Sequence, residues 1–104
     1  MKRGEVWWVD LPAPVGLRPA VLVSRNQAYR IRTSITIVPL TRTIRRIPSE
    51  VPLGTADGIP KTSVANADDL ITVPKVRVRE YLTVLSAAKL VDLERAIKFA
   101  LDLP

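Results

Sequence analysis

The sequence predicts an α+β fold: a small, half-open β-barrel followed by one C-terminal amphipathic helix. Three observations support this prediction. The chain has 104 residues, a length that fits a single domain spanning residues 1–104. Aromatic residues make up only 5% of it, so the core has to be built from Val, Ile and Leu, which favours strands. Short apolar runs separated by turn residues precede one segment of helical period.

The first part of the chain is predicted to hold three strands. Residues 5–11 form the first strand, and residues 12–17 form a loop because two prolines and a glycine interrupt ladders and helices. Residues 18–24 form the second strand, whose proline lies near its start, where a ladder donor is not needed. Residues 25–33 are polar and basic, and we expect a loop with one helical turn. Residues 34–41 begin with apolar–polar alternation and form the third strand.

The middle of the chain is predicted to hold three shorter strands. Residues 42–48 (RTIRRIP) form a basic connection, and residues 49–53 form a short edge strand that contains a proline. Residues 54–58 are rich in Gly, Thr and Asp and form a turn. Residues 62–67 and 80–85 form two further strands, joined by an irregular segment.

The C-terminal segment changes to a helical period. Ser86 is a good N-cap residue, because its hydroxyl can accept a hydrogen bond from the first turn. Glu94 and Lys98 stand four residues apart in the favourable order on the polar side. The apolar face is made of Leu90, Leu93, Ile97 and Leu101.

Basic residues are concentrated in the first part of the chain. The net charge is +6, and residues 1–46 hold nine Lys and Arg against Glu5 and Asp10, a net of +7. Most of these cations are arginines, whose planar guanidinium matches a phosphate group. The pattern predicts an anionic polymer as partner. The alternative is that the basic charge only increases solubility.

The composition excludes several kinds of chemistry. Without cysteine there is no disulfide, zinc cluster or thiol nucleophile, and without histidine the commonest acid–base group is missing. Asp68 and Asp69 are the only adjacent carboxylates, and neighbours on a strand point to opposite faces, so no metal site is expected. No phosphate-binding glycine loop occurs, and we expect no cofactor.

The location expected from the sequence is the cytoplasm. No apolar stretch approaches the ~20 residues that span a bilayer, and the N-terminus MKRGEVWW lacks the apolar region of a signal peptide. We therefore expect no membrane association.

Arginine and hydroxyl groups remain as candidates for catalysis. Arg18 begins a strand after a loop, and Thr41 ends a strand before a basic connection. RNA supplies its own nucleophile, the ribose 2′-hydroxyl, so an arginine and a hydroxyl that stabilise charge on the phosphate could suffice. The alternatives are a surface salt bridge for Arg18 and a turn-capping hydroxyl for Thr41. Simple alternation places Thr41 on the face of Ile35 and Ile37, unless a bulge at Pro39 redirects it.

The two tryptophans are adjacent in the first predicted strand and must face opposite sides. We expect one of them, with Trp8 as the candidate, to stack on a base or to lie in a subunit interface. The alternative is that Trp7 and Trp8 both belong to the core.

Three segments, read in order, resemble the MazF/PemK family of toxins. RGEVWWVDL at residues 3–11 is similar to the family's opening strand. GLRPAVLVS at residues 16–24, followed by Asn26, resembles its G-x-RPA-apolar-VS-x-N segment. IVPLT at residues 37–41 resembles the end of its third strand, and weaker matches continue into the closing helix.

The resemblance implies an SH3-like, half-open barrel that works as a homodimer. Members of the family cleave single-stranded RNA at short sequences without a metal, through the 2′-hydroxyl, and a cognate antitoxin holds them inactive. The family's catalytic arginine and threonine fall on Arg18 and Thr41. We expect the antitoxin to be an acidic, partly disordered segment that competes with RNA. The alternative is a non-enzymatic nucleic-acid-binding module or a gyrase-poisoning toxin of the same fold.

RNA-binding residues are predicted from the resemblance and from the basic loops on either side of the third strand, which we expect to converge on one groove. The chain departs from the family pattern in two places: Asp68-Asp69-Leu70-Ile71 replaces a segment whose glutamine reads bases, and Arg42 replaces a small residue. The first loop also lacks the carboxylate that many members carry there. The predicted RNA-binding residues are Trp8, Arg25, Asn26, Arg42, Thr43, Arg45, Asp68 and Asp69.

Overall fold

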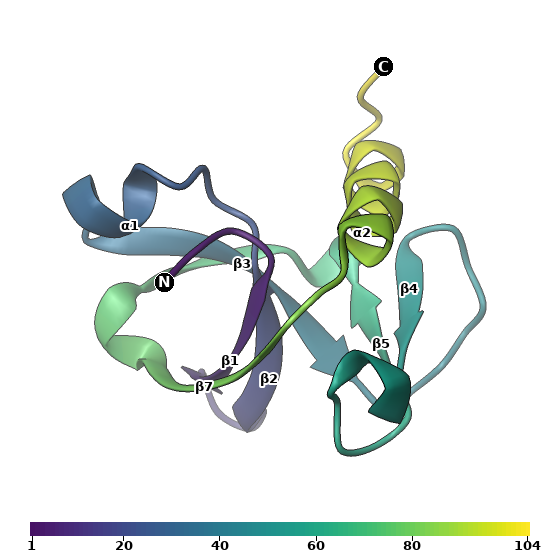
Figure 1. Ribbon diagram of the computed structural model, residues 1–104, viewed down its shortest axis with the longest axis horizontal. Helices are drawn as coiled ribbons and strands as arrows, with labels where there is room; N and C mark the ends of the chain where they lie inside the picture. Colours follow the sequence, from purple (N-terminus) through teal and green to yellow (C-terminus); the bar gives the residue numbers. More distant parts are fainter.

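A computed structural model describes all 104 residues, and its elements follow one another along the chain as Figure 1 shows. The helices are α1 (Ala28–Ile31) and α2 (Ala87–Ala100), with single 3₁₀ turns η1 (Thr55–Asp57), η2 (Ala67–Asp69) and η3 (Lys75–Arg77). The strands are β1 (Glu5–Leu11), β2 (Gly16–Leu22), β3 (Ser34–Thr41), β4 (Glu50–Leu53), β5 (Ser63–Asn66), β6 (Ile71–Pro74) and β7 (Val78–Val84).

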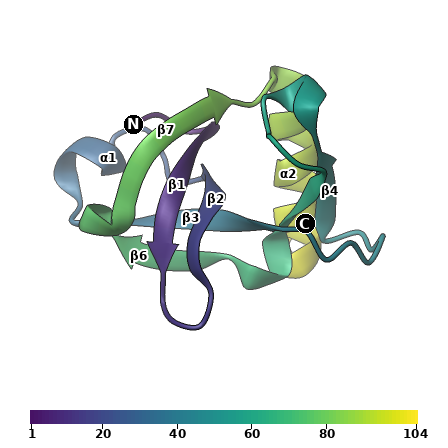
Figure 2. The same ribbon diagram turned by 90° about the horizontal axis from the view of Figure 1, so that it is seen from below.

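The seven strands form one antiparallel sheet in the order β4-β5-β3-β2-β1-β7, and β6 also pairs with β3. Strand β3 has β2 on one edge; on the other it has β6 along its first half and β5 along its second. The sheet therefore divides at the middle of β3. In Figure 2, strands β6, β3, β2, β1 and β7 curve into an open barrel beside α2 and β4. This confirms the predicted α+β fold with a half-open barrel and a C-terminal helix.

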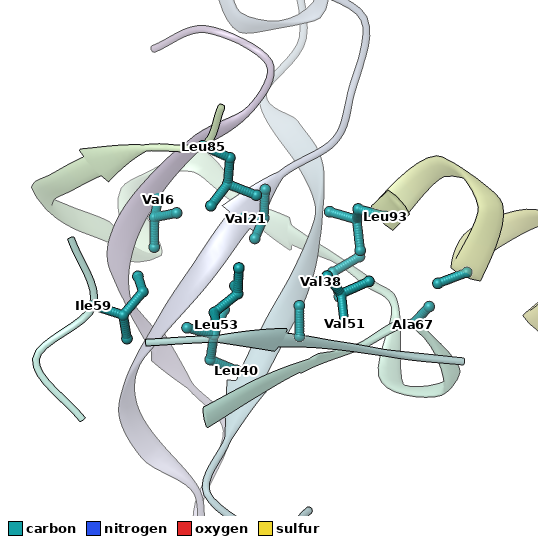
Figure 3. Close-up of a cluster of buried hydrophobic side chains, with 12 residues drawn as sticks. Val6, Val21, Val38, Leu40, Val51, Leu53, Ile59, Ala67, Leu85 and Leu93 are labelled. Carbon is teal, nitrogen blue, oxygen red and sulfur yellow. The ribbon is translucent and has the colours of Figure 1, made fainter. Parts of the chain in front are cut away.

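Two hydrophobic clusters lie on opposite faces of β3, because its alternate side chains point to opposite sides. The barrel cluster consists of Val9, Leu11, Ala20, Leu22, Tyr29, Ile35, Ile37, Val73 and Val78. The helix-side cluster, drawn in Figure 3, consists of Val6, Val21, Val38, Leu40, Val51, Leu53, Ile59, Ala65, Ala67, Leu85, Leu93 and Ala96. Residues 37–40 of β3 are consequently buried on both faces.

Helix α2 begins as predicted. The Ser86 hydroxyl accepts a hydrogen bond from the Lys89 amide at 3.2 Å. The helix buries Leu93 and Ala96 against the helix-side cluster. Leu101 was placed on the apolar face, and this prediction is wrong: the helix ends at Ala100 and Leu101 is 52% exposed.

The main error in the predicted strands is β6 (residues 71–74), which lies in the segment predicted to be irregular. It pairs with residues 34–37 of β3 and buries Val73 in the barrel cluster, while Thr36 and Thr72 share a hydrogen bond of 2.8 Å across the pair. Strand β2 also begins earlier than predicted, at Gly16, because residues 16–19 pair with the end of β1.

The predicted helical turn in residues 25–33 is α1, which contributes Tyr29 to the barrel cluster. The Tyr29 hydroxyl donates to the carbonyl oxygen of Ser24 at 2.9 Å, and burial raises the pKa of this phenol to about 12. The predicted edge strand with its proline is β4, which lies at the end of the sheet. None of the helices combines the length and the apolar character that crossing a bilayer requires.

Candidate functional site

A groove of about 450 Å³ opens where the start of β2 meets the end of β3. Strands β1, β2 and β3 supply one part of its wall, and the connections before β4 and before β5 supply the rest. Its lining residues are Trp8, Leu17, Arg18, Pro19, Leu40, Thr41, Arg42, Thr43, Ile59, Pro60, Lys61 and Ser63.

The pairing of β2 with β3 brings Arg18 and Thr41 to the same place. Ala20 pairs with Pro39 in an antiparallel register, so Arg18 and Thr41 each lie two residues beyond this last pair, at the same end of the paired strands. The two residues are 23 positions apart in the sequence, and both line the groove. The structure therefore brings together the two residues proposed as catalytic from the sequence.

Arg18 is half-buried, and it takes part in no ion pair or side-chain hydrogen bond, unlike Arg3 or Arg77, which both pair with carboxylates. The surface salt bridge considered as an alternative is absent. A half-buried guanidinium without a protein partner keeps all its donors available for an anion in the groove.

Thr41 is also half-buried, and its hydroxyl oxygen accepts a hydrogen bond from the Thr43 amide at 3.2 Å. The alternative that the Thr41 hydroxyl caps a turn therefore describes its observed hydrogen bond correctly. It leaves the hydroxyl proton free, so Thr41 can still donate to a ligand oxygen. The three pairs between β2 and β3, which end at Pro39, show no register shift, so the predicted bulge is not seen within this pairing.

The groove is basic at its rim and apolar on its floor. Arg42 and Lys61 are exposed cations on its wall, and no carboxylate lines it. Leu40 and Ile59, both labelled in Figure 3, belong to the helix-side cluster and form part of the floor. Such a surface attracts phosphate groups and can accommodate the flat face of a base.

The two tryptophans face opposite sides, as expected for neighbours in a strand. Trp8 is half-buried and lines the groove. Trp7 packs on the barrel cluster, its indole nitrogen donates to Glu5 at 3.0 Å, and its ring meets Tyr81 edge-on with centroids 5.9 Å apart. Neither tryptophan is fully buried, so the alternative that both belong to the core is wrong.

The expectation that the two basic loops converge on one groove is wrong within a single chain. Arg25 and Asn26 follow the end of β2, whereas Arg42 follows the end of β3, and the two antiparallel strands end at opposite sides of the barrel. Eight residues of β3 separate the two loops, a span of about 23 Å. The Asn26 side chain accepts a hydrogen bond from the Arg3 amide at 2.7 Å and so ties down the N-terminus.

Three other predicted RNA-binding residues also lie outside the groove and have partners within the chain. Asp68 accepts a hydrogen bond from Ser49 at 2.6 Å, and Asp69 accepts one from the Asn66 side chain at 3.1 Å. Arg45 lies beside Glu50, with 3.9 Å between its guanidinium nitrogen and a carboxylate oxygen. Thr43 and Arg42, by contrast, line the groove.

Sequence reasoning missed the wall formed by Ile59, Pro60 and Lys61. The segment lies beyond the turn η1, which is followed by Gly58 with a left-handed φ of 82°. The available signal was Lys61, an isolated cation between a turn and a strand. Nothing in the local sequence indicated that this turn folds back onto the helix-side cluster through Ile59.

No group of three or more His, Cys, Asp or Glu side chains is close enough together to hold a metal ion. The polar chemistry of the groove is therefore that of guanidinium, ammonium, hydroxyl and backbone groups. These groups recognise and stabilise negative charge, which makes an anionic ligand the natural occupant.

Known proteins resemble this chain over its full length. Endoribonuclease MazF9 of Mycobacterium tuberculosis is 36% identical over 115 residues, covering 99% of this chain and 98% of that protein. Probable endoribonuclease MazF5 of the same organism is 36% identical over 102 residues, covering 96% of this chain and 92% of that protein.

Solved structures give the same result. A mycobacterial endoribonuclease in complex with its cognate antitoxin superposes with a TM-score of 0.90 at 34% identity, covering 100% of this chain and 97% of that one. The Mycobacterium tuberculosis toxin MazF-mt6 superposes with a TM-score of 0.88 at 27% identity, covering 96% and 98%. The family described as PemK-like, MazF-like toxins of type II toxin–antitoxin systems matches residues 2–101, and the chain belongs to this family.

Proposed function

We propose that this protein is a toxin endoribonuclease that cleaves single-stranded RNA in the groove at the junction of β2 and β3. The observation that carries the proposal is the half-buried, unpartnered Arg18 in the same groove as the Thr41 hydroxyl, whose proton is free to be donated. Relatives that are 36% identical over nearly the whole chain are named endoribonucleases, which supports the same activity here.

The proposed reaction uses the ribose 2′-hydroxyl as nucleophile. Its oxygen attacks the neighbouring phosphorus, the bond from phosphorus to the 5′-oxygen breaks, and the products are a 2′,3′-cyclic phosphate and a 5′-hydroxyl. One proton leaves the 2′-oxygen and one is taken up by the 5′-oxygen. Because no carboxylate lines the groove, we propose that both protons are exchanged with water.

Arg18 and Thr41 would act on the phosphate. Negative charge accumulates on the non-bridging oxygens as the fifth bond to phosphorus forms, and a fixed guanidinium stabilises this charge. The Thr41 hydroxyl, oriented by the Thr43 amide, would donate a further hydrogen bond. Catalysis of this kind depends on the position and charge of side chains, and it needs no bound cofactor.

The remaining lining residues would bind the strand. Arg42 and Lys61 would contact flanking phosphates, and Trp8 offers a ring on which an unpaired base can stack. Arg25, Asn26, Arg45, Asp68 and Asp69 lie outside the groove, so a role for them in RNA binding stays a prediction that requires a strand extending beyond it.

Partners are proposed on the same basis. One solved relative is described as bound to its cognate antitoxin. For this chain we propose an acidic antitoxin segment that occupies the groove, contacts its three cations Arg18, Arg42 and Lys61, and excludes RNA. We also propose that the toxin is a homodimer of single-domain chains and acts in the cytoplasm. A competition experiment at fixed ionic strength, with sedimentation of the free protein, would measure both properties.

The test of the activity is incubation of the purified protein with a long RNA in the presence of EDTA. We expect discrete cuts with 2′,3′-cyclic phosphate ends, and no cut at a site whose 2′-hydroxyl is replaced by hydrogen. Bound but intact RNA would contradict the proposal and favour a non-enzymatic binding module, and inhibition of gyrase with intact RNA would favour a gyrase poison.

A further inference from the structure

We propose that Glu50 is a positioning residue whose buried carboxylate holds the basic loop against the groove. The basic loop consists of residues 42–48, which make up all but the last residue of the connection from β3 to β4. This inference rests on the proposed function, because the loop supplies Arg42 and Thr43 to the groove wall. It adds a residue that neither lines the groove nor touches its contents.

The basic loop has few internal contacts to fix its shape. It contains no helix or strand, and all its residues are exposed. One hydrogen bond fixes its start, from the Thr43 amide to Thr41, and one closes its end, from the Glu50 amide to the Ile47 carbonyl at 3.0 Å. The middle of the loop makes no other backbone hydrogen bond within the chain.

Glu50 supplies the missing contacts. One carboxylate oxygen, Oε1, accepts hydrogen bonds from the Arg45 amide at 2.9 Å and from the Arg46 amide at 3.0 Å. The side chain is only 2% exposed, so these two bonds are shielded from water. Hydrogen bonds to an ionised, buried acceptor are stronger than those between neutral groups, so one side chain can order the loop.

The backbone at Arg46 shows that the loop is held away from its preferred conformation. Arg46 has a φ of 55°, in the left-handed region that residues with a Cβ avoid. The Arg46 amide is one of the two groups that donate to Glu50, so the carboxylate stabilises the loop at the residue whose backbone conformation is unfavourable.

The second carboxylate oxygen argues against a role in stability alone. Oε2 of Glu50 is buried and has no hydrogen-bond partner within the protein; the Arg45 guanidinium lies 3.9 Å away, on a side chain that is 56% exposed. A buried acceptor without a hydrogen bond is unfavourable for folding. Glu50 therefore carries a cost in stability at Oε2, while its Oε1 fixes the loop that supplies Arg42 and Thr43 to the groove wall.

The first measurement uses the unchanged protein. Amide hydrogen exchange should show the Arg45 and Arg46 amides protected, although both residues are exposed at the surface. Unprotected amides at these two positions would overturn the proposal without any variant.

The second measurement compares Glu50→Gln with Glu80→Gln, a matched change at an exposed glutamate on β7 that has no ion pair or side-chain hydrogen bond. In Glu50→Gln we expect exchange at Arg45 and Arg46 to be about tenfold faster. We expect KM for RNA to rise more than kcat falls. The slope of log K against log[salt] should become shallower by about 0.7 if Arg42 loses one phosphate contact. The control should change none of these quantities.

A third variant separates loop shape from charge. Arg46→Gly removes the penalty of the left-handed conformation, so it should restore part of the loss when combined with Glu50→Gln, measured against Arg46→Gly alone. If Glu50→Gln fails to fold, Glu50→Asp replaces it; this variant keeps the charge but is too short to reach both amides.

The outcomes distinguish this inference from the proposed function. RNA cleavage by the unchanged protein, together with unaltered KM, salt slope and amide exchange in Glu50→Gln, would overturn the inference alone. The absence of any RNA cleavage by the unchanged protein would contradict the proposed function, while amide exchange would still decide whether Glu50 holds the loop.

Discussion

Replacing Arg18 by alanine is the most direct test of the groove. Arg18 forms no ion pair and no side-chain hydrogen bond, so its removal leaves no protein group unpaired. Substitutions of this kind change stability by about 0.5 kcal/mol or less, and we expect the melting temperature to stay within a few degrees. The loss should appear in the cleavage rate instead.

The expected loss follows from the position of the guanidinium. In a half-buried site with an effective dielectric constant of about 20, two unit charges 4 Å apart interact by about 4 kcal/mol. If the phosphate gains one unit of charge in the transition state, the rate should fall about a thousandfold, since each ~1.4 kcal/mol corresponds to a factor of ten. Removal of one preorganised donor typically costs about 10²- to 10³-fold, which agrees with this figure.

The assay is single-turnover cleavage of an RNA with one susceptible site, with Arg32→Ala as the control. Arg32 is an exposed arginine without an ion pair, at the far end of β3. Its replacement should leave the single-turnover rate unchanged. Arg18→Lys should also be impaired, because an ammonium cannot reproduce the paired donors of a guanidinium. If Arg18→Ala cleaved at more than a tenth of the original rate, the assignment of Arg18 to catalysis would be wrong.

Three further predictions concern the rest of the groove. Thr41→Val should lower the cleavage rate about tenfold or more because it removes the hydrogen bond that the hydroxyl donates. Thr43→Val leaves the Thr43 amide in place and should have little effect on the rate. Equal losses in the two variants would contradict the role of the Thr41 hydroxyl. Gly58→Ala should lower the free energy of unfolding, measured in urea, by about 1–3 kcal/mol, because Gly58 has a left-handed φ of 82° and an added Cβ would overlap the Thr83 side chain. An unchanged free energy of unfolding would show that the turn can relax. RNA affinity should depend on salt with a slope of about −2 for three phosphate contacts, one for each cation in the groove, and a slope near zero would exclude phosphate binding there.

Most of the strands, and the meeting of Arg18 and Thr41 in one groove, could be predicted because their signals are local. Strand β1 and strand β3 lie within the predicted ranges, since β-branched runs ending at prolines or a basic connection mark their limits. Arg18 and Thr41 were identifiable as an arginine and a hydroxyl at strand ends, and the resemblance to the family selected the same two positions.

Strand β6 could not be predicted because its stability comes from a partner distant in the sequence. Ile71–Pro74 is short and ends in a proline, so it carries little strand signal of its own. It pairs with the first half of β3, and Val73 is buried only because the barrel curves around it. The same limit explains why Lys61 was missed: its segment reaches the groove through Ile59, which is buried in the helix-side cluster.

The basic loops show how charge in a sequence can mislead. Arg25 and Arg42 lie in loops with similar composition on either side of β3, which suggested one shared surface. Antiparallel pairing places the ends of β2 and β3 on opposite sides, so only the loop after β3 reaches the groove. The density of charge along the sequence therefore did not indicate which basic loop lies at the groove.

The division of the sheet at β3 has a consequence for how the toxin can diversify. The groove lies at the point where β3 leaves β2 and joins β5, so its rim is formed by the connections on either side of β4. Most of the residues in these two connections stand outside the strand ladders and can change in sequence or length without breaking strand pairing. If the proposed function holds, selection for a new RNA target can act on the rim alone, while Arg18 and Thr41 keep the positions that the barrel strands give them.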